Sequence, residues 1–317
     1  MALPIVSDRA FLAGVFFNQL EMPSAALSLL SELTTYVRST QPTESYKWLE
    51  AIPGLQLWTG QRSITTLESG EFSISSFVYE NGLEIPRDDA RDDSTGQVAT
   101  RMVEDFAVRA AEHPIETLST LIEAGAASVC HDGQFMYDTD HPIDGGTQSN
   151  DISVDISALP VSQHGSTTSP SIEELMLAIY LGVIQIVGLK DKRAKPINRS
   201  ARSFGVLVPL NLMMAAGAAA GVTTVSGGQL NPLQAQQTFQ LLVEPSPDLS
   251  WTDQFLVWRR DGTMRPYIFQ EREGTKFDFL GEGSEENAKN RRHLALVERT
   301  YGMGYGRYTT CCLVTLT

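Results

Sequence analysis

Residues 94–126 read STGQVATRMVEDFAVRAAEHPIETLSTLIEAGA, and this stretch decides the fold. It begins with a capping box, because the Ser94 hydroxyl and the Gln97 side chain can each satisfy a backbone donor at the other's position. Apolar side chains then recur at steps of three and four residues, at Ala99, Met102, Val103, Phe106, Ala107 and Ala110. This spacing predicts one long amphipathic helix with a single apolar face.

Pro114 is the one residue that opposes this helix. It cannot donate to the hydrogen-bond ladder and its ring clashes with the preceding turn, so we expect a kink or a restart there and a stop at Gly125. Leu118, Leu121 and Ile122 resume nearly the same face. A continuous helix would span roughly 45 Å at 1.5 Å per residue, which indicates a scaffold for contacts rather than the wall of an active site.

The composition is that of an ordinary soluble globular protein. The 317 residues are 42% hydrophobic and 20% charged, enough for one extended domain or two to three subdomains. The net charge of −14 argues against a surface built to grip nucleic-acid phosphates, although it does not exclude a container for DNA. Cys130, Cys311 and Cys312 show neither a disulfide framework nor a metal spacing, so we expect buried thiols in a reducing cytoplasm.

Neither end of the chain nor its long uncharged stretch predicts a membrane segment. The start lacks the basic region and apolar core of a signal peptide. Residues 203–243 carry no charge, but Pro209, Asn211 and an Ala/Gly-rich run dilute their hydropathy. We expect a buried strand at 204–208 followed by a helix that begins at Pro209 and runs through Ala220.

The region before the long helix has the character of an arm and a loop. Residues 1–45 contain a short helical pattern around 11–20 between Ser/Thr-rich connections. Residues 61–87 predict a half-exposed β-hairpin, either at a domain edge or as an extended loop that pairs with a neighbouring subunit. Residues 80–93 carry six carboxylates, typical of a solvated face and otherwise of an inter-subunit ion-pair surface or a metal site.

Residues 130–142, CHDGQFMYDTDHP, are the one segment that looks chemical. Two histidines and three aspartates lie within eleven residues and could in principle bind a divalent metal. The spacing fits neither HExxH nor an EF-hand, and Gly133 and Pro142 make turn formation a sufficient explanation. A metal-dependent enzyme remains an alternative, with a site formed by Asp132, Asp138, Asp140 and His141.

The remainder predicts a mixed lobe followed by strands. Residues 144–169 favour a long surface loop. Ser171 predicts the start of a helix, with Glu173 and Glu174 in its first turn. Residues 190–202 favour an exposed basic loop. Short apolar runs in the last third predict a small sheet that packs on the long helix. Within them we expect 302–306 to form a glycine-rich turn between strands.

An ordered series of short motifs resembles the major head subunits of Mu-like phages. The series is Tyr46-Lys47-Trp48-Leu49, Trp58-Thr59-Gly60-Gln61-Arg62, Tyr79-Glu80, Ile85-Pro86-Arg87-Asp88-Asp89, Asp92-Asp93, Gly96, Asp132-Gly133-Gln134, Phe135, His141-Pro142 and Tyr301–Arg307. The resemblance covers residues 44–142 and 295–310, and residues 143–290 match only in the order of elements.

This resemblance implies the α+β Hong Kong 97-type capsid fold. Its parts would be an N-terminal arm at 1–45, an extended-loop region at 46–93, a spine helix with part of the peripheral domain at 94–170, an axial α/β domain at 171–245 and a β-rich return at 246–317. The assembly-interface candidates are Trp48, Trp58, Arg62, Phe72, Ile74, Tyr79, Arg87, Asp88, Asp89 and Asp92. We expect Trp58 and the 64–85 hairpin to become buried only on assembly.

The function implied is that of a major capsid protein that self-assembles into the icosahedral head shell enclosing double-stranded DNA of a tailed phage or prophage. We expect no catalytic residue, cofactor, metal or membrane. The implied partners are other copies in hexamers and pentamers, a portal, a separate scaffold and protease, and a cementing protein as a further candidate. The implied location is the virion, assembled in the bacterial host cytoplasm. An encapsulin-like nanocompartment shell is the alternative from the same fold.

Overall fold

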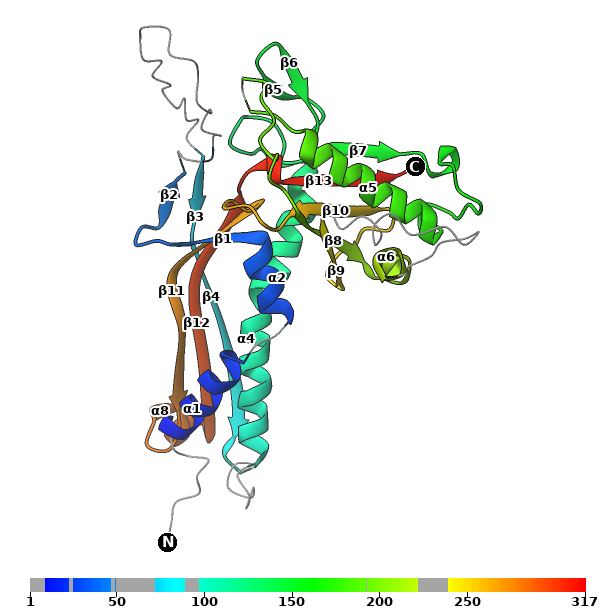
Figure 1. The fold of residues 1–317 in the computed structure, drawn as a ribbon. Helices are drawn as coiled ribbons and strands as arrows, with labels where there is room; N and C mark the ends of the chain where they lie inside the picture. Colours follow the sequence, from blue (N-terminus) through cyan, green and yellow to red (C-terminus); the bar gives the residue numbers. More distant parts are fainter. Residues whose placement is uncertain are drawn as a thin grey trace, which may run out of the picture.

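The computed structural model describes residues 9–22, 25–46, 49, 72–88, 97–191, 193–221 and 239–317. Within these ranges the chain forms an elongated part, in which a long helix lies along a four-stranded sheet, and a second lobe around a five-stranded sheet (Figure 1). No helix of the described ranges combines the length and hydropathy needed to cross a membrane.

The long helix, α4, runs from Gln97–Glu123 and continues into a 3-10 turn, Ala124–Ala126. Its 27 residues span about 40 Å at 1.5 Å per residue. It passes through Pro114 without a break, so the expected restart is wrong, while the stop near Gly125 is confirmed. Pro114 removes one ladder donor, but its own ring and the following Ile115 and Leu118 are buried, and such packing supplies most of a helix's stability. The capping residues 94–96 lie outside the described ranges.

The four-stranded sheet has the order β1-β11-β12-β4. Its strands are β1 Thr34–Arg38, β11 Tyr267–Leu280, β12 Arg292–Tyr305 and β4 Phe77–Pro86. β11 and β12 form a long antiparallel ribbon whose far end carries the short helix α8, Glu285–Asn290, while β1 joins β11 in parallel. This ribbon and α4 run side by side (Figure 1).

Two N-terminal helices pack on this part. α1, Arg9–Leu20, confirms the predicted helical pattern, and the Phe16 ring stacks on Phe277 of β11 with centroids 4.5 Å apart. α2, Ala25–Leu33, leads directly into β1 and was not predicted, because its Ser/Thr content indicated a connection.

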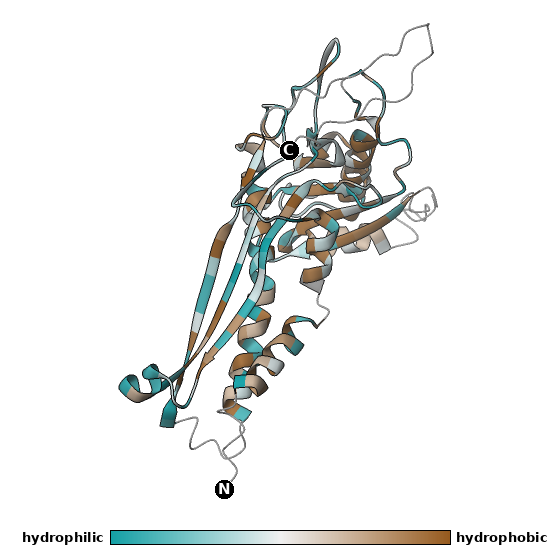
Figure 2. Ribbon diagram, turned by 90° about the vertical axis from the view of Figure 1, so that its left-hand side faces the viewer, coloured by the Kyte–Doolittle hydropathy of each residue, from teal (hydrophilic) through white to brown (hydrophobic). Residues whose placement is uncertain are grey.

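The five-stranded sheet has the order β7-β13-β10-β8-β9. Its strands are β7 Asp151–Val154, β13 Cys311–Leu316, β10 Gln254–Arg259, β8 Ser203–Pro209 and β9 Gln240–Ser246. Helices α5, Ile172–Gly188, and α6, Met213–Gly221, pack against it. Ser171 and Glu174 form the reciprocal capping box at the start of α5, as predicted. Figure 2 shows hydrophobic residues gathered in this lobe, whereas the long strands of the other sheet alternate in hydropathy.

The two sheets meet over the C-terminal half of α4. Leu118 and Ile122 of the helix share one buried cluster with Trp258 of β10 and with Tyr267 and Tyr305 of the ribbon. The Tyr305 hydroxyl donates to the Leu121 carbonyl at 2.9 Å. The late strands therefore divide between two sheets, whereas we expected one.

Two segments before and after α4 form strands within the sheets, one in a region predicted as a β-hairpin and one in a region predicted as a loop. Residues 77–86 pair along their whole length with β12, and Ile85 is buried in the subunit, so this segment is not one arm of a free hairpin. Residues 151–154 pair in parallel with β13 instead of belonging to a surface loop. Two short hairpin-like pairs complete the fold, β2 Thr43–Ser45 with β3 Ser73–Ser75, and β5 His141–Ile143 with β6 Gly146–Gln148.

The glycine-rich segment 302–306 is mostly strand rather than the expected turn. Gly302 and Gly304 lie in β12, where β3 crosses at very close range. A Cβ on Gly302 would overlap the Ser75 carbonyl oxygen, and one on Gly304 would lie 2.5 Å from Ile74 Cδ1. These glycines therefore serve the close approach of another strand, which is the reason the sequence placed a turn here wrongly.

We predict that Gly302→Ala lowers the free energy of unfolding by about 1–3 kcal/mol, because the added methyl group forces β3 away from β12. Urea unfolding followed by circular dichroism measures this change. The matched control is Gly274→Ala in β11, where a Cβ meets nothing within 4 Å. Equal stabilities of the two variants would contradict the close approach.

Candidate functional site

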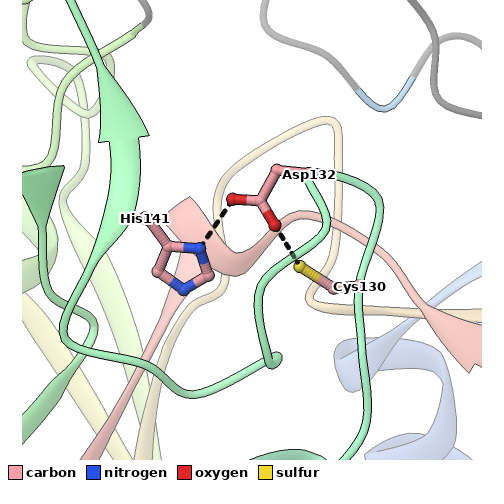
Figure 3. A group of neighbouring side chains, drawn as sticks. All are labelled: Cys130, Asp132 and His141. Carbon is pink, nitrogen blue, oxygen red and sulfur yellow. Dashed lines mark hydrogen bonds and ion pairs between the residues drawn. The ribbon is translucent and has the colours of Figure 1, made fainter.

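The loop that follows α4 folds back on itself around the carboxylate of Asp132. This carboxylate accepts a hydrogen bond from Cys130 Sγ at 3.0 Å and another from the Gln134 backbone at 3.1 Å, and its second oxygen lies 2.7 Å from His141 Nδ1 (Figure 3). The His141 side chain has no exposed surface and that of Asp132 is 7% exposed. These residues form a polar cluster inside the protein.

Asn150 extends this cluster on the other side of the imidazole. Its Oδ1 lies 3.0 Å from His141 Nε2, and its Nδ2 donates to the Met136 carbonyl at 2.8 Å and to the Tyr308 carbonyl at 3.3 Å. The His141 ring also stacks flat on the Tyr308 ring, with centroids 3.6 Å apart. The cluster thus ties the loop after α4 to the turn that precedes β13.

Two opposing effects set the charge of Asp132. Burial disfavours the carboxylate, but the hydrogen bonds from His141 and Cys130 outweigh it and lower its pKa to about 2. For the Cys130 thiol, burial and the neighbouring Asp132 both raise the pKa. At neutral pH the cluster therefore contains an aspartate anion and a neutral thiol.

The structure brings together a different set of residues from the one expected for a metal enzyme. Among the described residues, Cys130, Asp132 and His141 offer ligand atoms that all lie within 4.8 Å of one another. Asp140 is exposed, and Asp138 instead accepts from the backbone of Thr139 at 2.7 Å. The expected four-residue set is therefore not assembled.

Sequence reasoning missed three members of the cluster, Cys130, Asn150 and Tyr308. Cys130 carried a local signal, since it stands two residues before Asp132, but it was treated only as a buried thiol. Asn150 lay in a segment interpreted as a surface loop, and Tyr308 is 167 positions after His141, so no spacing pattern could have joined them.

The described assembly-interface candidates lie along β3, β4 and the residues after β4. Ile74 is buried inside the subunit and Phe72 is half-buried beside it. The Tyr79 ring stacks on Tyr301 with centroids 4.4 Å apart. Arg87 is exposed, and Asp88 accepts from the Arg291 guanidinium at 3.2 Å. Trp48, Trp58, Arg62, Asp89 and Asp92 lie outside the described ranges.

A surface that the sequence did not reveal lies on α5. One side of this helix is buried, as predicted, at Leu175, Ile179, Val183 and Ile186. Its exposed side chains, however, are also apolar: Ile172, Leu181, Ile184 and Val187. Ile184 is 52% exposed, and Met214 of the neighbouring α6 is 86% exposed. A helix that is apolar all round normally lies buried, yet these side chains stay exposed among the residues that the structure describes.

Known proteins match the first half of the chain by sequence. Residues 14–159 match the family model described as Mu-like prophage major head subunit gpT. The Mu-like prophage FluMu major head subunit of Haemophilus influenzae is 36% identical over 135 residues, which are 43% of this chain and 44% of that protein. The major capsid protein of Escherichia phage Mu is 32% identical over 118 residues, 37% of this chain and 38% of that protein. The matches therefore span less than half the length of these relatives.

The fold is matched over nearly the whole chain. A procapsid structure of bacteriophage JBD30 superposes with a TM-score of 0.53 and 19% identity, covering 96% of this chain and 74% of that one. The chain has the Hong Kong 97-type capsid fold expected from the sequence, and the resemblance to Mu-like major head subunits is confirmed. Neither the nanocompartment nor the metal enzyme is favoured by these matches.

We predict that Asp132→Asn destabilises the protein in a pH-dependent way. Loss of the buried charge pair should cost about 3–5 kcal/mol at pH 7. The pKa of Asp132 is 3.8 in the unfolded chain and lower in the folded protein, so the ionised carboxylate stabilises the fold at pH values above 3.8. This stabilisation is lost as the pH falls towards 2. The difference between wild type and variant should therefore shrink by about 2 kcal/mol between pH 5 and pH 2.

Urea unfolding of both proteins at several pH values measures this difference. Asp144→Asn, which changes an exposed carboxylate in the same loop, is the control and should leave the stability unchanged. A difference that stays constant down to pH 2 would show that the Asp132 carboxylate is not held ionised by its neighbours.

Proposed function

From the match of residues 14–159 to Mu-like prophage major head subunits, we propose that this chain is the major capsid protein of a tailed phage or prophage. It assembles with copies of itself into the icosahedral head shell that encloses double-stranded DNA. The role is structural and requires no catalytic step. The family match carries this proposal, and the capsid fold of the whole chain supports it.

The exposed face of α5 gives a physical reason for self-assembly. Three apolar side chains on one helix face, Leu181, Ile184 and Val187, forgo roughly 25 cal/mol of stabilisation for each Å² of apolar surface that contact with another subunit would bury. A closed shell covers such a face with neighbouring copies, since each subunit presents the same surface to the next. We propose that the α5 face is buried between subunits around the axes of hexamers and pentamers.

The net charge of the chain is compatible with a shell that encloses DNA. With a net charge of −14, the chain repels DNA on average, which suits a wall that encloses densely packed DNA without binding specific sequences. The mature location is the virion, and assembly takes place in the bacterial host cytoplasm. The partners beyond other copies are a portal, a separate scaffold and protease, and a cementing protein.

The interface candidates differ in what they already contact within the subunit. Arg87 is exposed next to the end of β4 and can meet a neighbouring subunit, whereas Asp88, also exposed, already pairs with Arg291 of its own chain. Ile74 already packs inside the subunit, so its contribution to assembly is to fix β3 in place. Trp48, Trp58, Arg62, Asp89 and Asp92 remain proposed contacts, together with Phe72 and Tyr79.

We predict that the purified, untagged chain forms particles in the megadalton range, or rings of five and six subunits. Light scattering, with negative-stain images of the same fractions, measures the mass and shape. A clean 34.8 kDa monomer or small dimer, unchanged by concentration and crowding, would contradict the shell function.

We predict that Ile184→Asp prevents assembly while leaving the subunit folded. The side chain is half exposed, so the subunit's stability should change by no more than about 0.5 kcal/mol. Each subunit contact would lose apolar burial and acquire a charge, which should raise the concentration needed for assembly about tenfold or more. Ile184→Leu is the matched control and should assemble like the wild type. Normal assembly of Ile184→Asp would exclude this face from the interface.

A further inference from the structure

The orientation of the Asn150 amide fixes where one proton of the Asp132 cluster lies. Its Nδ2 faces two backbone carbonyls, those of Met136 and Tyr308, and a carbonyl oxygen can only accept. Its Oδ1 therefore accepts, from the Asp138 backbone at 3.0 Å and from His141 Nε2 at 3.0 Å. His141 must carry a proton on Nε2.

The other imidazole nitrogen then faces a carboxylate. His141 Nδ1 lies 2.7 Å from Asp132 Oδ2, a distance at which a bare lone pair would repel the anion. A second proton on Nδ1, or a cation in its place, is required. The other carboxylate oxygen lies 3.0 Å from Cys130 Sγ and holds the thiol proton in the same way. Two protons therefore lie among three side chains whose polar atoms are all metal ligands.

We propose that Cys130, Asp132 and His141 form a binding site for one divalent transition metal of the zinc type. The metal replaces the thiol proton and the Nδ1 proton, and both protons leave to solvent. Before the exchange, one proton lies between Cys130 Sγ and Asp132 Oδ1 and one between His141 Nδ1 and Asp132 Oδ2, so the two protons offset the charges of the three deprotonated ligands. The cluster is also neutral afterwards, with a thiolate, a carboxylate, a neutral imidazole and the dication. The exchange therefore adds no net charge to a buried site.

The donor set selects the metal. A thiolate, an imidazole nitrogen and a carboxylate suit Zn²⁺ and its spectroscopic substitute Co²⁺, whereas Mg²⁺ and Ca²⁺ prefer oxygen ligands alone. The Nε2–H···Oδ1 bond from His141 to Asn150 is the kind of outer contact that orients a metal-binding histidine and leaves its other nitrogen free to coordinate.

A second observation points to a further ligand beside the cluster. His131 Nδ1 is buried and has no hydrogen-bond partner among the described residues. Its ring packs on the same Tyr308 ring that His141 covers, at 5.8 Å between centroids. His131 lies outside the 4.8 Å group, and its unpartnered buried nitrogen makes it the candidate for a fourth ligand.

The location of the site indicates a structural role. Cys130 and Asp132 lie in the loop after α4 and His141 begins β5, and Tyr308 and Asn150 connect these ligands to β13 and β7. A bound metal would therefore cross-link the junction between the helix and the five-stranded sheet. This differs from our expectation from the sequence, which was of no metal, and it involves no catalysis.

Titration of the untagged full chain with Co²⁺ tests the site. We expect one Co²⁺ per chain, a thiolate-to-cobalt charge-transfer absorption, and displacement of Co²⁺ by Zn²⁺. Cys130→Ser should lose the charge-transfer band. Cys312→Ser is the matched control, because Cys312 is equally buried but contacts only the Leu313 carbonyl, and it should keep the band. Absence of binding, binding without the band, or an unchanged band in Cys130→Ser would overturn the proposal.

A second measurement needs no variant. Zn²⁺ that binds only the folded chain should raise the midpoint of thermal unfolding progressively with free Zn²⁺ concentration, and a chelator should reverse the rise. A midpoint that does not respond to Zn²⁺ would leave the cluster as a proton-held ion pair and would also overturn the proposal. Neither result depends on whether the chain assembles into a shell.

Discussion

The packing of the C-terminal half of α4 between two sheets is the contact on which the rest of the structure depends. Leu118 and Ile122 fill the space between Trp258 of one sheet and Tyr267 of the other, and all four side chains are almost completely buried. Without this cluster the four-stranded sheet and the five-stranded sheet would share only their connecting segments. The long helix therefore joins the two sheets through one shared buried cluster.

Much of this arrangement followed from local patterns in the sequence. The periodicity of α4, the capping box of α5 and the apolar runs of β10, β11 and β13 each act within a few residues, so reasoning from the chain alone could find them. Pro114 shows where local patterns fail. Its lost hydrogen bond and its clash with the preceding turn predicted a break, but the ring is buried in the core and the helix continues. Gly302 and Gly304 show another limit: they accommodate β3, more than two hundred residues away, and no local pattern carries that information.

The candidate site also contains residues that the sequence pointed to and residues that only the fold reveals. Asp132 and His141 stand close together in the sequence and were recognised, but their meaning depended on Asn150 and Tyr308, which only the fold brings to them. The apolar outer face of α5 was also hidden, since its sequence reads as a well-buried helix. Only the exposed fractions of the side chains reveal that Leu181, Ile184 and Val187 stay uncovered among the described residues.

The β11–β12 ribbon also acts mechanically. Together with α4 it forms an arm about 40 Å long that starts at the junction of the sheets, so a rotation of about 5° at that junction moves its far end by about 3.5 Å. The pairing register shifts between Glu271 and Lys276, where β11 carries extra residues that oppose none on β12. Such bulges bend and twist a ribbon locally. The register shifts therefore place a local bend and twist in the ribbon between the junction of the sheets and its far end.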